Sequence, residues 1–165
     1  MKRMLAGILI FSLLLSGCGI FKEIISEPVT FYYLSAEYTF GSNSGVIAAE
    51  EREASNHRQD LAYLLALYLM GPANDDHRSP LPTGTRIINP EQNGSIITME
   101  LVNSVRKLSD ADLSLACACL TLTCLDITDA TEVSITYGEQ TVTMHQDSLT
   151  LVDDSRVNSE TEEAQ

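Results

Sequence analysis

The cysteines and histidines are the residues most able to bind a metal or to act as nucleophiles. Cys117, Cys119 and Cys124 lie close together, and Cys117 and Cys124 share one face if the segment is helical. A zinc site needs ligands whose spacing brings thiolates together, which Cys-x-Cys on a helix does not do. A disulfide between positions 117 and 124 cannot close, at roughly 1.5 Å of helix rise per residue. We expect small buried hydrophobic side chains here.

The histidines His57, His77 and His145 are scattered. Asp75-Asp76-His77 could attract a cation, but loop composition explains this run better, and we predict no metal and no cofactor. No serine lies in a Gly-x-Ser-x-Gly elbow, so no catalytic residue is predicted. Carboxylates that pair only in space are invisible in a sequence, which leaves a hydrolase as an alternative. That alternative requires a concave polar pocket with a perturbed carboxylate or histidine.

The N-terminal residues predict a covalent modification. A short basic start precedes an apolar run at 4–15, which is too short to span a membrane and suits a signal peptide. The next residues, Leu15-Ser16-Gly17-Cys18, resemble a bacterial lipobox. That resemblance implies cleavage before Cys18 and a diacylglyceryl thioether on its sulfur. The alternative is an ordinary signal peptide with an incidental cysteine.

The predicted organisation has four parts: a lipoprotein signal peptide at 1–17, a lipidated tether at 18–28, a folded domain at 29–151 and an acidic disordered tail at 152–165. Each buried acyl methylene stabilises anchoring by about 0.8 kcal/mol, so two or more chains on Cys18 hold the protein on the extracytoplasmic face of the cell membrane. The net charge of −13 opposes binding to nucleic acid or to anionic headgroups. A hydrophobic content of 44% is enough for a packed core.

A helix at about 56–70 is expected to organise the domain. Its apolar residues recur at helical spacing, and Asn56 or Ser55 could cap its start, with Asp60 in the first turn. Gly71 and Pro72 end it. Because nearly every position is apolar, we expect burial on most sides.

Strands are predicted on both sides of this helix. Val29, Phe31 and Tyr33 occupy one face of an opening strand. The segment 46–53 reads either as its hairpin partner or as a helical turn. Gln92-Asn93-Gly94 predicts a hairpin that returns through 95–101. The alternating segment 131–137 predicts a strand that turns at 138–140 into 141–144.

A second helix is predicted to start at Ser109, where Asp112 completes a capping-box pattern. Its apolar stripe comprises Leu113, Cys117, Leu120, Cys124 and Ile127. A strand at 120–124 is the alternative. The expected fold class is α+β, with a single small mixed sheet and two main helices on one face.

With these residues read, the chain resembles a GerM-type domain, a family of sporulation and spore-germination lipoproteins. The resemblance spans about 29–144, although Glu100 stands where the family commonly has Asp and only one domain is present. It rests on Phe31-Tyr32-Tyr33, the segment 46–52, Leu69-Met70-Gly71-Pro72, Pro82-Thr83-Gly84-Thr85, Met99-Glu100-Leu101, the second helix, and Val133-Ser134-Ile135 with Gly138.

The resemblance implies a fold similar to ring-building modules and a non-enzymatic role without catalytic residues. We therefore expect a membrane-anchored protein–protein interaction or assembly module in sporulation, germination or cell-envelope organisation. Its expected partners are the membrane, through the lipid on Cys18, and envelope or sporulation proteins. The alternative is a lipoprotein that binds peptidoglycan or a small ligand. The sequence does not locate the binding surface.

Overall fold

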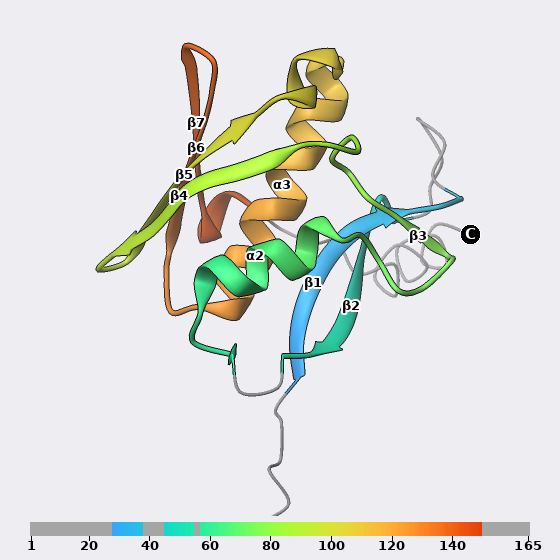
Figure 1. Cartoon of the computed structure of the whole chain (residues 1–165), viewed down its shortest axis with the longest axis horizontal. Coiled ribbons are helices and arrows are strands. Elements are labelled where there is room, and N and C mark those ends of the chain that lie inside the picture. The colour runs from blue at the N-terminus through green and yellow to red at the C-terminus, as the bar shows by residue number, and fades with distance from the viewer. Residues whose placement is uncertain (1–27, 38–44, 55–56, 150–165) are drawn as a thin grey trace, which may run out of the picture.

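The computed structural model describes residues 28–37, 45–54 and 57–149 (Figure 1). The signal peptide, Cys18, most of the tether, the acidic tail and the expected caps Ser55 and Asn56 lie outside these residues. Within the described part, no helix is long and apolar enough to cross a membrane. The elements in chain order are β1 (Pro28–Ser35), β2 (Ile47–Glu53), α2 (Leu61–Leu69), β3 (His77–Arg78), β4 (Arg86–Asn93), β5 (Ile96–Val102), η2 (Ser104–Lys107), α3 (Asp110–Ile127), β6 (Glu132–Tyr137), β7 (Gln140–His145) and η3 (Gln146–Ser148).

The α+β class is confirmed, but the strands form two sheets where one was expected. Sheet A has the order β2-β1-β3, and sheet B has the order β4-β5-β6-β7. Among the strands of the described ranges, only the β5–β6 pair is parallel, because the long α3 connects those strands as a crossover. Figure 1 shows α3 between sheet B and β1, with α2 beside it.

Side chains of the helices explain why β1 does not join sheet B. The backbone N–H of Tyr32 donates to Thr123 Oγ1 on α3 at 2.9 Å. The hydroxyl of Tyr68 on α2 donates to the carbonyl of Tyr32 at 3.1 Å. Both backbone groups of Tyr32 on the edge of β1 away from β2 are therefore satisfied without another strand.

Two buried threonines show that α3 is covered on opposite sides. Thr123 faces β1, as described above, while the Thr121 hydroxyl lies 3.6 Å from Met144 Sδ on β7. Positions two apart on a helix point in roughly opposite directions, at about 100° per residue. Both side chains are fully buried. The central helix of the domain is thus α3 and not α2.

The helix starts follow local capping chemistry. Ser109 caps α3 by accepting from Asp112 N–H at 3.2 Å, as predicted. The first helix begins later than expected, because Asp60 is its cap and accepts from Tyr63 N–H at 3.0 Å. The helical reading of 120–124 is confirmed.

The helix α2 is less buried than its composition predicts. Leu64, Leu65 and Tyr68 form its buried face. Ala62 and Ala66 are exposed, so the expectation of burial on most sides was wrong. An apolar sequence does not ensure burial when the element lies at the periphery of the layers.

The predicted hairpins are present. Within the segment 46–53, residues Ile47–Glu53 pair with β1 as an antiparallel strand, which excludes the helical turn. The β4–β5 hairpin turns through Gly94, whose positive φ of 62° glycine adopts at little cost. A register shift between Ile88 and Glu91 places a bulge at Asn89, which has a φ of 51°.

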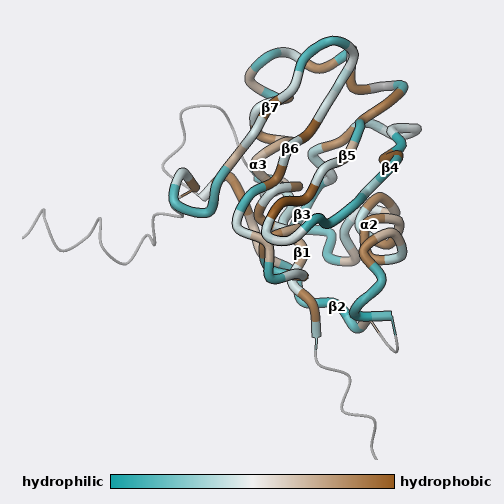
Figure 2. The backbone as a smooth tube through the Cα atoms, turned by 90° about the vertical axis from the view of Figure 1, so that its left-hand side faces the viewer, coloured by the Kyte–Doolittle hydropathy of each residue, from teal (hydrophilic) through white to brown (hydrophobic). Residues whose placement is uncertain are grey.

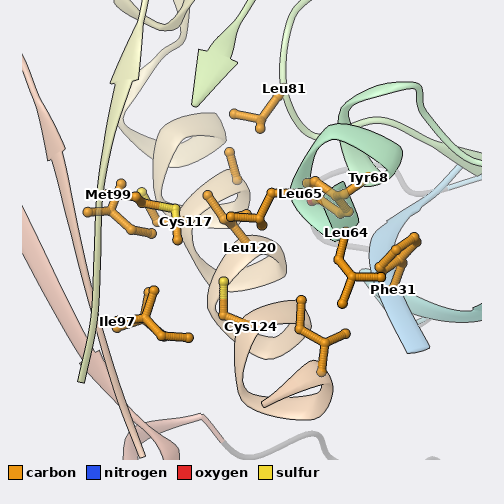
Figure 3. Close-up of a cluster of buried hydrophobic side chains, with 14 of the residues drawn as sticks. Phe31, Leu64, Leu65, Tyr68, Leu81, Ile97, Met99, Cys117, Leu120 and Cys124 are labelled. Carbon is orange, nitrogen blue, oxygen red and sulfur yellow. The ribbon is translucent and has the colours of Figure 1, made fainter. Parts of the chain in front are cut away.

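The core joins the aromatic residues of β1 to the helices and to sheet B. The rings of Tyr33 and Tyr68 stack with centroids 5.0 Å apart, and Phe31 meets Tyr68 edge-on at 5.9 Å. Figure 3 shows Leu120 on α3 lying between β5 and α2. The expected inward face of β1 and the apolar stripe of α3 are both in this core, with Leu113 at its margin.

Among the described residues, no helix covers the second face of sheet B, onto which Figure 2 looks. Hydroxyl side chains from neighbouring strands pair there: Thr136 Oγ1 lies 3.1 Å from Thr141 Oγ1, and the Thr143 hydroxyl donates to Ser134 Oγ at 3.3 Å. Cross-strand threonine pairs of this kind stabilise exposed sheet faces.

Candidate functional site

A buried carboxylate organises the loop after α2. Glu50 on β2 is 8% exposed, and its two oxygens accept from the backbone N–H groups of Ala73 at 2.9 Å and Asn74 at 3.1 Å. Arg52 Nη1 and His77 Nδ1 each lie 3.1 Å from an oxygen of the same carboxylate. We call Glu50 and these four contacts the Glu50 hub.

The electrostatics of the hub favour an ionised carboxylate. Burial alone raises the pKa of Glu50, but the two backbone N–H donors, His77 and Arg52 outweigh it and lower the pKa below its ordinary value. Arg52 also donates from Nη1 to the carbonyl of Gly71 at 3.2 Å. One buried charge therefore ties the end of α2, the following loop and β2 together.

The hub supports a small hollow at the end of α2, which we call the helix-end groove. It has a volume of about 190 Å³ and is lined by Leu69, Met70, Gly71, Ser79, Leu81, Pro82, Thr83, Gly84 and Thr85. Met70 is 80% exposed at its rim. Gly71 has a φ of 90°, which glycine adopts readily when it ends a helix. The groove thus combines one exposed thioether with a fixed backbone.

The opposite wall is held by hydrogen bonds within the Pro82–Thr85 turn. Both the N–H and the hydroxyl of Thr85 donate to the carbonyl of Pro82, at 3.1 and 2.8 Å. Asn103 Nδ2 donates to the carbonyl of Gly84 at 3.3 Å, which connects the turn to the end of β5. The two sequence motifs Leu69-Met70-Gly71-Pro72 and Pro82-Thr83-Gly84-Thr85 therefore meet in space.

A larger polar cleft lies where the start of α2 meets the end of α3. Its volume is about 390 Å³, and Arg58, Asp126 and Asp129 are among the residues that line it. Gln92 Nε2 donates to Asp129 Oδ1 at 2.6 Å. Charges of both signs make this cleft suited to a small polar ligand.

The three cysteines of α3, Cys117, Cys119 and Cys124, lie among the buried residues of the domain. All three are free and buried. Burial raises the pKa of Cys117 to about 11 and those of Cys119 and Cys124 to about 12. Thiols in this state are poor nucleophiles.

The histidines are not brought together. His77 joins the Glu50 hub, His145 Nδ1 lies 3.4 Å from Glu132 Oε2, and His57 stacks on Tyr63 with centroids 4.3 Å apart. Asp75 and Asp76 are exposed in the loop before His77. Across the described ranges, no group of three or more His, Cys, Asp or Glu residues could hold a metal ion.

Sequence reasoning missed Glu50, because the acidic stretch 50–53 reads as a solvated strand. The hairpin register, which the structure supplies, accounts for its burial: Glu50 pairs with Phe31, which lies on the inward face of β1. Residues opposite each other on antiparallel strands share a face, so this pairing places the carboxylate inside.

Comparison with known proteins identifies the fold. No family model and no curated protein matches this sequence. The structure is similar to the tandem GerMN domains of the sporulation protein GerM from Bacillus subtilis, with a TM-score of 0.50 and 15% identity over 74% of this chain and 43% of that chain. It is also similar to a candidate lipoprotein from Clostridium perfringens, with a TM-score of 0.44 and 13% identity over 74% of this chain and 91% of that chain.

The likeness to GerM confirms the expected GerM-type fold, and at this identity it bears on the fold alone. This chain spans less than half the length of the GerM structure.

Proposed function

We propose that this protein is a lipid-anchored, extracytoplasmic assembly module that binds other envelope proteins through its helix-end groove and catalyses no reaction. The observation that carries the proposal is Met70, an apolar side chain 80% exposed beside a groove whose walls are fixed by hydrogen bonds to the carbonyls of Gly71, Pro82 and Gly84. A flexible thioether adapts to the surface of a partner, and a fixed backbone lowers the entropy lost on binding.

The GerM-type fold supports a setting in sporulation, germination or cell-envelope organisation, since GerM is a sporulation protein. The lipobox at Leu15–Cys18 supports anchoring through Cys18. Pro28, where β1 starts, lies ten positions after Cys18, so the tether spans at most about 35 Å. The domain would then work close to the membrane surface.

A charge placed in the groove tests the binding role. Met70→Asp should abolish recovery of envelope proteins from mildly solubilised membranes, because it replaces the apolar contact by a charge. Ala66→Asp adds the same charge at an exposed position of α2 and should leave recovery unchanged. Equal recovery by both variants, or no partner with the unaltered chain, would contradict the proposal.

Membrane anchoring is tested separately. Cys18→Ala should release the protein from membranes or leave its signal peptide uncleaved, as measured by fractionation and by the mass of the chain. Cys119→Ala changes a buried cysteine elsewhere and should keep the membrane partition of the unaltered chain. An unchanged partition of the Cys18→Ala variant would refute lipidation.

The polar cleft favours a second candidate function, the binding of peptidoglycan or a small solute. Arg58 and the two aspartates Asp126 and Asp129 could hydrogen-bond hydroxyl, amide or charged groups of such a ligand. Sedimentation with purified cell wall discriminates between the candidates, because an assembly module should stay in the supernatant. Cosedimentation that Asp126→Asn weakens would favour the cleft.

A further inference from the structure

The outer edge of β2 is a second surface on which a protein could dock. Within the described residues, β2 lies at the end of sheet A and pairs with β1 alone. It is seven residues long, which is enough to pair along its length with an added strand. No residue of β2 lines the helix-end groove, although Arg52 donates to the carbonyl of Gly71, so the two surfaces are tested through residues outside this contact.

The hydrogen-bond pattern shows which backbone groups point outward. The N–H of Ser35 donates to the carbonyl of Val46 at 3.0 Å, so this opposed pair is hydrogen-bonded across the ladder. Bonded and non-bonded pairs alternate along antiparallel strands. Ala48, Glu50 and Arg52 therefore also belong to hydrogen-bonded pairs, so their backbone N–H and C=O groups point toward β1. The backbone groups that point away from β1 belong to Ile47, Ala49, Glu51 and Glu53.

An independent contact confirms this alternation. Tyr32 is opposite Ala49, which belongs to a non-bonded pair. The N–H and carbonyl of Tyr32 accordingly point away from β2, where they meet Thr123 and Tyr68. Ala49 must likewise direct its own N–H and carbonyl to the free edge.

The second half of this edge carries acidic side chains, whereas Ile47 and Ala49 occupy its first half. Glu51 and Glu53 are exposed, and because they are two apart they lie on the same face of β2. Arg52, between them, is engaged by Glu50 and the carbonyl of Gly71. Pairing β2 with a second copy would bring like charges close together, which is unfavourable. The edge of β2 therefore disfavours pairing with β2 of a second molecule and favours pairing with a strand that carries positive charge.

We propose that β2 accepts an extended, basic segment of a partner protein as a fourth strand of sheet A. Lys or Arg residues two apart in that segment face Glu51 and Glu53, and the outward groups of Ala49, Glu51 and Glu53 bond its backbone. This inference rests on the proposed protein-binding function and names the chemistry of one partner. Charges on an edge also keep copies apart, so the test must separate strand addition from simple charge attraction.

The probe is a fluorescent peptide of alternating Lys and Thr, titrated onto the full chain in detergent and followed by polarisation. Two further peptides carry backbone N-methyl groups, one at every Lys and one at every Thr. In an added strand only one of these alternate sets of N–H groups faces β2. Strand addition therefore predicts that one methylated peptide binds about tenfold more weakly or worse, while the other is nearly unchanged.

Charge reversal in the protein supplies the matched control. Glu51→Lys with Glu53→Lys should shift the preference from the Lys peptide to a Glu–Thr peptide. Glu91→Lys with Glu139→Lys changes the net charge equally at exposed positions of β4 and the β6–β7 turn, and should keep the Lys preference. Circular dichroism of each variant verifies that it is folded.

The possible outcomes separate this inference from the function proposed above. Equal binding of both methylated peptides, or no binding of the Lys peptide, would overturn strand addition at β2. Partner recovery that depends on Met70 would still stand in that case. Conversely, the peptide could bind at β2 while Met70→Asp leaves partner recovery unchanged. That result would overturn binding through the helix-end groove and support strand addition at β2.

Discussion

The two helices of this domain differ in how far they are buried, and their sequences do not predict the difference. Every residue of α2 is apolar or aromatic, yet only one of its faces is buried. The longer α3 contains threonines, cysteines and aspartates, yet it is buried on opposite sides between sheet B and β1. Burial is set by the place of an element among the layers, and only secondarily by its own hydrophobicity.

The largest expected effect is a cavity in α3. Leu120→Ala should reduce the free energy of unfolding by about 4–5 kcal/mol, because Leu120 lies between β5 and α2 and its cavity cannot easily collapse (Figure 3). Leu65→Ala should cost about 2–3 kcal/mol, since α2 has an open side and can shift inward. Urea unfolding measures both, and a larger loss for Leu65→Ala would reverse the ranking of the helices.

The next effect is a lost hydrogen bond at the junction of β1 and α3. Thr123→Val keeps the shape of the side chain but leaves the partly buried N–H of Tyr32 without its acceptor, at a cost of about 1–3 kcal/mol. Thr121→Val is the matched control, because it removes only a weak hydroxyl contact to sulfur, and it should cost less than about 1 kcal/mol. Equal costs for the two variants would show that Thr123 does not hold β1 in place.

The same junction explains what the sequence could and could not reveal. The alternation of Val29, Phe31 and Tyr33 and the Ser109 cap depend on nearby residues, and both were predicted. The separation into two sheets depends on Tyr32, Tyr68 and Thr123, where Tyr32 and Thr123 are 91 positions apart. No local pattern reports such a contact, so a single sheet was the simpler expectation.

The sequence did not locate the candidate site. The motifs at Met70 and at Pro82–Thr85 were recognised as a resemblance, but nothing local indicated that they form one groove. Glu50 was missed because burial of a carboxylate depends on donors from another segment, namely the N–H groups of Ala73 and Asn74. The free edge of β2 became visible only once the hairpin register was known.

The stability that the loop after α2 contributes should depend on pH, whereas the stability that the apolar surroundings of α3 contribute should not. The pKa of Glu50 is lowered from its ordinary value of 4.5 in the folded state, so its contribution is fully present above about pH 4.5 and is lost as the pH falls through the folded pKa. Glu50→Gln should therefore lower Tm at pH 7 and flatten its decline in acid. Glu91→Gln, at an exposed position, is the control. Parallel declines for the unaltered chain and for Glu50→Gln would contradict a structural role for this carboxylate.

The smallest expected effect is on the open side of α2, where the contrast with α3 is sharpest. Ala66→Gln places a longer polar side chain at an exposed helical position and should change the free energy of unfolding by no more than about 0.5 kcal/mol. Glutamine favours helix almost as well as alanine, so the substitution tests coverage of this face and little else. Urea unfolding of the full chain in detergent gives the value. A loss above about 1 kcal/mol would mean that another part of the molecule or a second copy covers α2, and the two helices would then be buried alike.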